Sequence, residues 1–312
     1  MLKYVLKRLG YILVTLWVIV TCTFFMMKNL PGTPFDAERF SIMTPQQQER
    51  VLEMYGLNDS LPMQYVKYIK NMLKGDLGTS FTYVNQDVSK VITGRLGPSA
   101  LIGIQAVLIG LAIGLILGIL AAWKHNSGID YFTMILAVLG VSVPSFVAAA
   151  LLQYYIGLKW GVLPVGFWTG WNCSVLPSIA LSFSATAMVA RFMRTEMLDV
   201  LDQDYIVTAR AKGLSQMKVL MRHAVRNSIL PVVTILGPIV VNLMTGSLAV
   251  ENIFSIPGIG SLFVDCIKAN DYPVIMGITI FYAAFYMLIV LLVDLAYSLI
   301  DPRIRLAKGK ES

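Results

Sequence analysis

Apolar residues are gathered into long runs along this chain, and polar residues fill the segments between them. Six runs approach or exceed the roughly 20 residues that a helix needs to cross a bilayer core. They cover residues 9–27, 101–123, 131–158, 175–190, 229–250 and 274–299. Because backbone polar groups in lipid must bond within their own segment, each run predicts a transmembrane helix. The pattern therefore indicates an all-α membrane protein with six spans.

Composition supports lipid as the solvent of this chain. Hydrophobic residues make up 56% of it and charged residues 14%, with a mean hydropathy of +0.69, outside the range of ordinary soluble domains. The first run is too long for the apolar core of a signal peptide, and residues 27–31 offer no small-residue cleavage site, so we expect it to be retained. The net charge of +7 reflects Lys and Arg in cytoplasmic loops and gives no reason to expect nucleic acid as a partner.

The distribution of Lys and Arg predicts the orientation. The loop from 191 to 226 carries seven of them, whereas the short third-to-fourth and fifth-to-sixth loops hold only Lys159 and Lys268. Positive residues collect on the cytoplasmic side, so this loop and both termini are expected there, in a multi-pass protein of the cytoplasmic membrane. The expected parts are residues 1–28 with the first span, an external subdomain 29–97, and a core 98–312 with its cytoplasmic loop 191–228.

The external subdomain is expected to contain two short helices, at 45–55 and 61–73. The second has an apolar stripe at helical spacing, which is typical of a packing face. The stripe consists of Tyr65, Tyr68, Ile69, Met72 and Leu73.

The cytoplasmic loop contains two short amphipathic helices joined by a glycine. Asp202 is placed to cap the first helix, because its carboxylate suits the free N–H groups and the positive end of the helix dipole. Gly213 can adopt the left-handed conformation that closes a helix, and Ser215 offers the next cap. The second helix carries one stripe, made of Met217, Leu220, Met221, Ala224, Val225, Ser228 and Ile229. Fused to the fifth span, it forms a rigid lever that can convert a partner's motion into rotation of the bundle.

The loop reads Tyr205-Ile-Val-Thr-Ala-Arg-Ala-Lys-Gly213-Leu214, followed by His223-Ala-Val-Arg-Asn227 and Leu230-Pro231. It resembles the coupling-helix loop of ABC importer permeases, in the form typical of peptide transporters. The general motif of that family has Glu-Ala-Ala where this chain has Val207-Thr208-Ala209, and Ile-x-Leu-Pro where it has His223-Ala224-Val225-Arg226. These departures fit the oligopeptide branch.

The resemblance extends over nearly the whole chain, through residues 30–34, 75–80, 142–146, 251–260 and 294–303. It is nearest to the B-type permease subunit of oligopeptide importers, with dipeptide and nickel-type permeases as alternatives. It implies the six-helix type I importer arrangement. It also implies a homologous second permease, two cytoplasmic ATPases, an external peptide-binding protein, a peptide substrate and membrane lipid as partners.

The resemblance also implies which residues meet the ATPase. These are Tyr205, Thr208, Ala209, Arg210, Ala211, Lys212, Gly213 and Leu214. The alternative is that the small residues among them only pack locally. The chain has no G-x-x-x-x-G-K-[ST] phosphate loop, so ATP and Mg²⁺ are expected on partner chains, with no cofactor and no enzymatic step on this one.

Several polar or helix-bending residues fall at membrane depth and are candidates for the substrate pathway. They are Ser142, Pro144, Ser145, Gln153, Asn242 and Thr245. Polar groups along a channel suit peptides of varied sequence, but hydrogen bonds between helices account for the same residues equally well. Proline removes a backbone donor and bends helices, either along a pathway or as a tolerated kink.

Two other classes of function are open. An ion-coupled secondary transporter needs several intramembrane acids, and an intramembrane enzyme needs a buried catalytic constellation; neither His125 nor His223 lies in a predicted span. No metal-ligand spacing is present among Cys and His. Cys173 and Cys266 are both expected outside the membrane, where a disulfide between them is possible.

Overall fold

The computed structural model describes residues 2–29, 40, 42–54, 56–83, 86–244 and 248–300. Within these ranges the chain is helical apart from its loops and one isolated bridge between Thr79 and Asp87. It forms two compact units, Met1–Gly97 with Gly258–Phe285, and Pro98–Pro257 with Tyr286–Ser312. The long helices α5 (Val88–Trp123) and α14 (Tyr272–Ile300) each contribute to both units.

The first unit contains, besides parts of α5 and α14, the helices α1 (Leu2–Lys28), α3 (Pro45–Met54), α4 (Leu61–Leu73) and α13 (Ile259–Lys268). The helices expected at 45–55 and 61–73 are therefore confirmed as α3 and α4, and their external side stays a prediction. The core of the unit joins the start of α5 to α13 and α14. Its buried apolar residues are Val88, Val91, Ile92, Ile259, Leu262, Cys266, Tyr272, Val274, Ile275 and Ile278.

A buried carboxylate fixes the segment before α5 within this unit. Asp271 is 0% exposed and accepts hydrogen bonds from the Ser80 hydroxyl and from the backbone N–H groups of Phe81 and Thr82, at 3.2 and 3.0 Å. A buried charge is tolerated only when such donors replace its water. Ser80 and Asp271 are about 190 residues apart in the sequence, so no local pattern in the chain predicts their contact.

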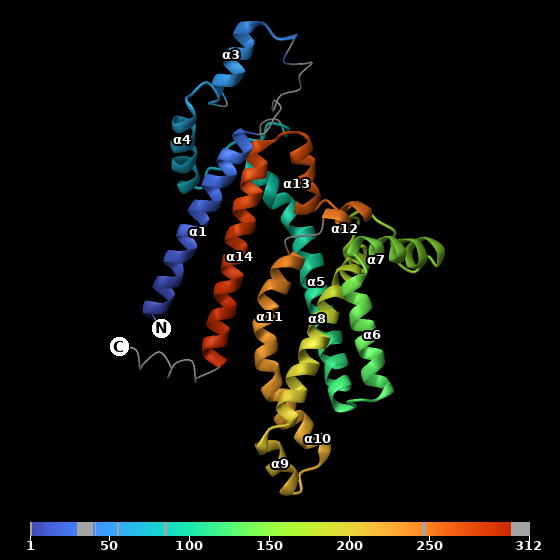
Figure 1. Ribbon diagram of the computed structural model, residues 1–312. Coiled ribbons are helices and arrows are strands. Elements are labelled where there is room, and N and C mark those ends of the chain that lie inside the picture. Colours follow the sequence, from blue (N-terminus) through green and yellow to red (C-terminus); the bar gives the residue numbers. More distant parts are fainter. Residues whose placement is uncertain are drawn as a thin grey trace. The chain divides into compact units, whose positions relative to one another are not determined.

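The second unit contains the remaining helices. They are α6 (Gly128–Ser142), α7 (Ser145–Leu152), the π-helix η1 (Gln153–Lys159), the short 3-10 helix η2 (Trp171–Ser174), α8 (Val175–Leu201), α9 (Asp204–Ala211), α10 (Gln216–Lys218), the π-helix η3 (Val219–Val225), α11 (Arg226–Met244) and α12 (Leu248–Ile253). Helix α8 is the central one, and its side chains Leu176, Leu181, Val189, Met193 and Met197 supply much of the buried core. Figure 1 shows α9 and α10 at the end of the unit where α8 ends and α11 begins.

Glycines on α5 allow it to lie directly against α8. A Cβ added at Gly110, Gly114 or Gly118 would come within 2.7 Å of an atom of Ala185, Val189 or Ala190. Small residues at four-residue spacing let helix backbones approach closely in membranes, where packing replaces the hydrophobic effect as the force between helices.

The predicted third span is not one helix. Helix α6 ends at Ser142, α7 begins at Ser145, and the two run at 100° to each other. Pro144 has no backbone N–H to donate, and Val143 before it adopts the extended conformation (φ −80°, ψ 118°) that a following proline favours. The structure therefore confirms the expected bending at Pro144 and corrects the expectation of a continuous helix over 131–158.

Helix α6 runs antiparallel to α8. Its first turn is bonded to the last part of α8 through Asp130 and Arg194, whereas Gly140 near its other end faces Phe183 and Ala187. The chain has thus passed from one end of the unit to the other when it enters α8. We interpret the bent pair formed by α6 and α7–η1 as one broken span.

Within the described residues, five helical runs are long and apolar enough to cross a membrane, and the bent pair makes a sixth. The five are α1, α5, α8, the run that begins with α10 and continues into α11, and α14. Each of the six predicted runs therefore overlaps a candidate span when the bent pair is counted as one. Helix α8 continues to Leu201, eleven residues beyond the predicted end at 190, because the helix outlasts its apolar stretch.

Candidate functional site

The candidate site is the connection between α8 and α11, which corresponds to the predicted coupling loop. Helix α9 begins after Gln203, whose extended backbone (φ −77°, ψ 146°) makes it the N-cap. The prediction that Asp202 caps this helix is wrong: Asp202 is the C-cap of α8, and its N–H bonds to the carbonyl of Leu198. Asp204, in the first turn of α9, places its negative charge near the positive end of the helix dipole.

Gly213 closes α9 as the sequence predicts. Its φ is +78°, its N–H donates to the carbonyl of Arg210 at 2.9 Å, and Leu214 N–H donates to the carbonyl of Ala209 at 3.3 Å. Any residue with a side chain would be strained in this left-handed conformation, and glycine is not. Ser215 occupies the N-cap of α10 as predicted, but its side chain makes no capping hydrogen bond.

The loop has a small apolar core of its own. Ile206, Ala209 and Val219 are buried, at 0%, 6% and 2% exposure, with Leu214 packed against them. Ala209 therefore faces η3 inside the loop, and the local-packing alternative describes its surroundings. The core holds α9 rigidly against η3.

The other predicted coupling residues lie on the outer surface of the loop. Thr208, Arg210, Ala211, Lys212 and Gly213 are exposed. Tyr205 is 43% exposed, and its hydroxyl accepts a hydrogen bond from the Asn227 amide at 3.1 Å. This bond connects α9 to the start of α11.

Apolar side chains add to that surface at positions outside the predicted set. Val207, Met217 and Met221 are 58%, 51% and 53% exposed. The predicted stripe on the second helix is wrong for Met217, Met221 and Ile229, which are exposed, and it omits the buried Val219. The reason is the π-helix η3, whose wider turn shifts which residues face inward.

The loop is attached directly to the bundle. Helix η3 continues into α11 without a break, and Ser228 on α11 is buried and donates to the carbonyl of Glu196 on α8 at 3.2 Å. The loop is therefore joined to α11 by continuous helix and to α8 by this contact.

An ion pair near this end of the unit was not predicted. The Arg194 guanidinium on α8 donates to both carboxylate oxygens of Asp130 on α6, from Nε at 2.6 Å and from an NH2 group at 2.8 Å. His125 Nδ1 lies 3.1 Å from the same carboxylate, which is 3% exposed. Arg194 thus joins α6 to α8 in addition to being one of the positive loop residues.

The predicted pathway residues do not form one site in the described chain. Ser142, Pro144 and Ser145 surround the break between α6 and α7, where Ser142 and Pro144 are exposed. The Gln153 amide in η1 donates to the carbonyl of Val165 in the following loop at 2.6 Å and to the carbonyl of Ile253 at the end of α12 at 2.7 Å. Asn242 is exposed on α11, and Thr245 lies outside the described residues.

A buried carboxylate on α12 also falls outside the predicted set. Glu251 on α12 is 2% exposed and accepts a hydrogen bond from the Ser99 hydroxyl on α5 at 2.7 Å. Cys173 in the second unit and Cys266 in the first are both buried free thiols. No group of three or more His, Cys, Asp or Glu side chains suited to a metal occurs in the described part of the chain.

Comparisons with known proteins cover the whole length of the chain. Residues 1–96 match the N-terminal part of the membrane component of binding-protein-dependent transport systems, and residues 114–306 match the inner membrane component. The chain is 46% identical over 306 residues to the dipeptide transport system permease protein DppB of Lactococcus lactis subsp. cremoris, covering 98% of this chain and 100% of the relative. It is 40% identical over 309 residues to the oligopeptide transport system permease protein OppB of Salmonella typhimurium, with 98% and 100% covered.

Solved structures support the fold independently. A chain of the methionine ABC transporter MetNI in an inward-facing conformation superposes with a TM-score of 0.54 at 14% identity, covering 68% of this chain and 97% of that chain. A chain of an amino acid ABC transporter superposes with a TM-score of 0.51 at 19% identity, covering 69% and 94%. The folded arrangement is therefore that of ABC transporter membrane subunits, and the chain belongs to the family of binding-protein-dependent transport system inner membrane components.

Proposed function

We propose that this chain is a permease subunit of an ATP-driven importer of short peptides in the cytoplasmic membrane. In this proposal it forms half of the channel with a homologous second permease, receives peptide from an external binding protein, and is driven by two separate ATPase chains that hold ATP and Mg²⁺. Full-length relatives that carry the names of dipeptide and oligopeptide permeases support the cargo class.

The cargo is stated as short peptides because both kinds of relative match over the full length. The dipeptide permeases of Lactococcus lactis and Bacillus subtilis and the oligopeptide permeases of Haemophilus influenzae and Salmonella typhimurium all cover at least 98% of this chain. What these cargoes share is a peptide backbone with charged ends. We retain the oligopeptide as the expected cargo and the dipeptide as its alternative.

The proposed mechanism rests on the structure of the connection between α8 and α11, which we call the α9 loop. An exposed surface of Tyr205, Val207 and Ala211 with the cations Arg210 and Lys212 stands on a loop that has its own buried core. A passive connection needs neither. We infer that the exposed surface docks on an ATPase, that Ala209 supports it from inside, and that η3 transmits the ATPase's movement to α11.

The test places the same charge at two exposed positions, one on the proposed docking surface and one away from it. Ala211→Glu places a charge on the exposed surface, and Asn252→Glu places the same charge on an exposed residue of α12, at the opposite end of the unit. Uptake of a labelled tripeptide, membrane abundance of the permease and co-purification of the ATPase are measured for each. We expect Ala211→Glu to lose uptake and ATPase binding with normal abundance, and Asn252→Glu to retain ATPase binding.

The same measurements separate the alternatives. An ion-coupled transporter or an intramembrane enzyme has no use for an ATPase, so either one predicts that Ala211→Glu leaves activity unchanged. Normal uptake with the ATPase still bound would refute the docking surface. Uptake of Ni²⁺ in place of peptide by the wild type would assign the chain to the nickel-type alternative.

A further inference from the structure

Helix α4 in the first unit lies against the final turns of the membrane-spanning helix α1. The Thr21 and Tyr65 hydroxyls are 2.7 Å apart, and the rings of Phe24 and Tyr68 stack with centroids 5.7 Å apart. The predicted packing stripe of α4 is confirmed at its two tyrosines, whereas Leu73 is 79% exposed. Because α1 ends its span at Lys28, α4 lies at the level where the bilayer meets water, where Tyr side chains are enriched.

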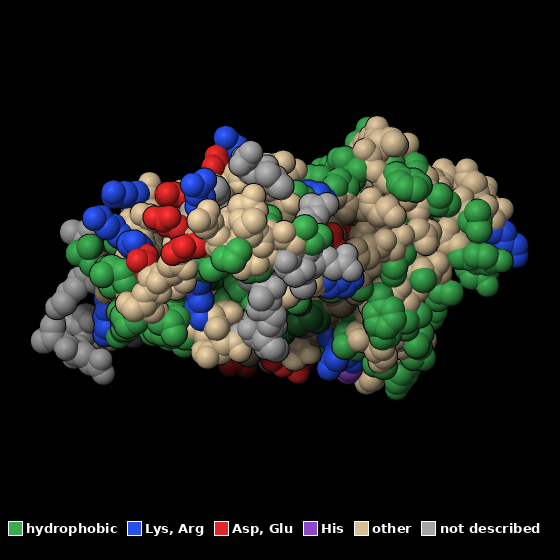
Figure 2. Space-filling view, turned by 90° about the horizontal axis from the view of Figure 1, so that it is seen from above, with side chains coloured by type: hydrophobic (Ala, Val, Ile, Leu, Met, Phe, Trp, Pro, Cys, Tyr) green, Lys and Arg blue, Asp and Glu red, His purple; other side chains and the backbone are tan. Residues whose placement is uncertain are grey.

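The composition of α4 suits that level. Met63, Val66 and Leu73 are exposed and recur at spacings of three and seven residues, so they lie along one side of α4, which Lys70 shares with them. Helix α4 itself holds Lys67 and Lys70 and no acidic residue. A helix with an exposed apolar face and lysines is the type that rests in the headgroup region, with its cations next to phosphates. Figure 2 shows charged side chains gathered over the part of the surface that α3 and α4 occupy.

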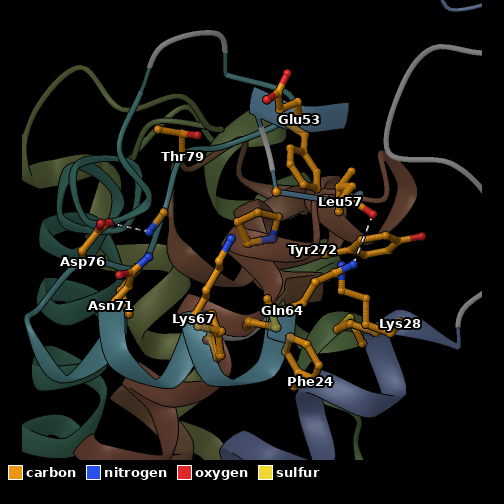
Figure 3. A pocket seen from close by; sticks show the side chains of 18 residues that line it. Phe24, Lys28, Glu53, Leu57, Gln64, Lys67, Asn71, Asp76, Thr79 and Tyr272 are labelled. Carbon is orange, nitrogen blue, oxygen red and sulfur yellow. Dashed lines mark hydrogen bonds between the residues drawn. The ribbon is translucent and has the colours of Figure 1, made fainter. Parts of the chain in front are cut away.

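A cavity of about 350 Å³ opens beside this contact, within the range of about 300–1,000 Å³ typical of small-molecule sites. It is lined by the end of α1, by one side of α4 from Gln64 to Asn71, by residues of the segments 53–57 and 76–81, and by the start of α14. Figure 3 shows the Lys67 side chain extending into it, with Lys28 rising from the end of α1 and the carboxylates of Glu53 and Asp76 on its wall.

Two donors in this cavity have no acceptor among the residues that the structure describes. The Lys28 ammonium lies 5.9 Å from the centre of the Phe24 ring and has no carboxylate partner in the described ranges. The Tyr68 hydroxyl oxygen is buried and lacks a hydrogen-bond partner in the same part of the chain. Lys67, in contrast, is paired with Asp59 at 2.6 Å. A buried donor without a partner costs free energy that an incoming acceptor recovers.

We propose that this cavity binds the headgroup of a zwitterionic phospholipid of the phosphatidylethanolamine type. Its phosphate accepts from Lys28, its ammonium faces the carboxylates of Glu53 and Asp76, and its acyl chains stay in the bilayer that α1 crosses. A purely anionic headgroup is attracted to Lys28 but repelled by the carboxylates of Glu53 and Asp76. A zwitterionic headgroup is attracted to both signs of charge on the cavity wall, so the cavity favours it.

The test is lipid binding to the full-length protein in complex with its partners, measured by native mass spectrometry after delipidation. Dioleoyl phosphatidylethanolamine, dioleoyl phosphatidylglycerol and glycerophosphoethanolamine, which lacks acyl chains, are titrated separately. We expect one phosphatidylethanolamine to bind more tightly than phosphatidylglycerol. Loss of a charge-assisted hydrogen bond in Lys28→Met weakens that binding about tenfold.

The matched control is Lys90→Met, which removes the same charge from an exposed lysine of the first unit that is paired with Asp87 at 2.9 Å. It should bind lipid like the wild type, and Lys28→Arg should recover most of the affinity. Equal binding by Lys28→Met and the wild type overturns the proposal, as does tighter binding of phosphatidylglycerol. Equal binding of glycerophosphoethanolamine assigns the cavity to soluble phosphate compounds and overturns the lipid. An unchanged thermal midpoint of delipidated Lys28→Met shows that the variant is folded.

Discussion

The close contact of α5 with α8 predicts opposite effects for one substitution at two glycines of the same helix. An alanine at Gly114 puts its Cβ 2.7 Å from Val189 Cβ and 2.8 Å from the carbonyl oxygen of Thr186. Both are rigid atoms that no side-chain rotation can move. An alanine at Gly94 meets nothing within 4 Å.

The magnitudes follow from two opposing effects. Replacing a helical glycine by alanine stabilises a helix by about 1 kcal/mol, because glycine loses more backbone entropy on folding. Overpacking a tight contact costs about 1–3 kcal/mol. Gly94→Ala should therefore raise the free energy of unfolding by about 1 kcal/mol, and Gly114→Ala should lower it by about 1 kcal/mol. The two variants differ by about 2 kcal/mol although the chemical change is identical.

The assay is unfolding of the purified chain in mixed detergent micelles with increasing sodium dodecyl sulfate, followed by far-ultraviolet circular dichroism. The midpoints of the two variants should lie on opposite sides of the wild-type midpoint. Stabilisation by both alanines would show that α5 does not touch α8 at Gly114, and would refute the packing on which the second unit is built.

Three further predictions concern buried polar groups. Asp271→Asn should lower the free energy of unfolding by about 2–3 kcal/mol in the same assay, because its carboxylate loses charge-assisted hydrogen bonds; the exposed Asp265→Asn is the control, and equal effects would contradict the role of the buried site. Burial, aided by Asp271 and Asp265, raises the pKa of Cys266 to about 12, so the thiol should react with iodoacetamide at least tenfold more slowly at pH 9 than after denaturation, and the stability due to its protonation should be lost as pH rises from about 9 through about 12. Rapid labelling of the folded protein at pH 9, measured by mass spectrometry, would refute this burial. Arg194→Met should lower the free energy of unfolding by about 3–5 kcal/mol, because it leaves the Asp130 carboxylate buried without its partner. The double variant Arg194→Met with Asp130→Leu should recover most of this loss, and a double variant no more stable than the single one would contradict the pairing.

The spans were accessible from sequence because lipid imposes one requirement that composition reveals. Each predicted apolar run contains or overlaps a long helix, and α3 and α4 begin where the polar pattern places them. The bend at Pro144 was foreseeable as a type of event, since proline and the residue before it are both restricted. Its angle depends on what α7 packs against, which no local rule contains.

The orientation of side chains in the α9 loop was harder to predict. A family motif states which residue types occur, but an eight-residue helix has too few turns to show which side faces inward. Ala209 was therefore expected on the docking surface and lies in the loop core instead. The π-helix η3 has more residues per turn than the 3.6 of an α-helix. Met221 is therefore exposed where the periodic stripe predicts burial.

Contacts between residues far apart in the sequence could be predicted neither from the apolar runs nor from the family motif. Asp130 and Arg194 are 64 residues apart, and each has an ordinary explanation alone: an acid in the first turn of a helix and a positive residue near a cytoplasmic loop. Only the antiparallel course of α6 and α8 brings them together.

The broken span decides whether the chain crosses the membrane an even or an odd number of times. A bent pair that returned to its own side would leave five crossings, an odd number, and would put the two termini on opposite faces of the membrane. Because α6 starts beside the end of α8 and η1 is held next to Ile253 near the other end of the unit, the pair completes a passage and the count is even. Reporter fusions at the two termini should therefore give the same signal, and a difference between them would mean that the 100° turn at Pro144 sends the chain back.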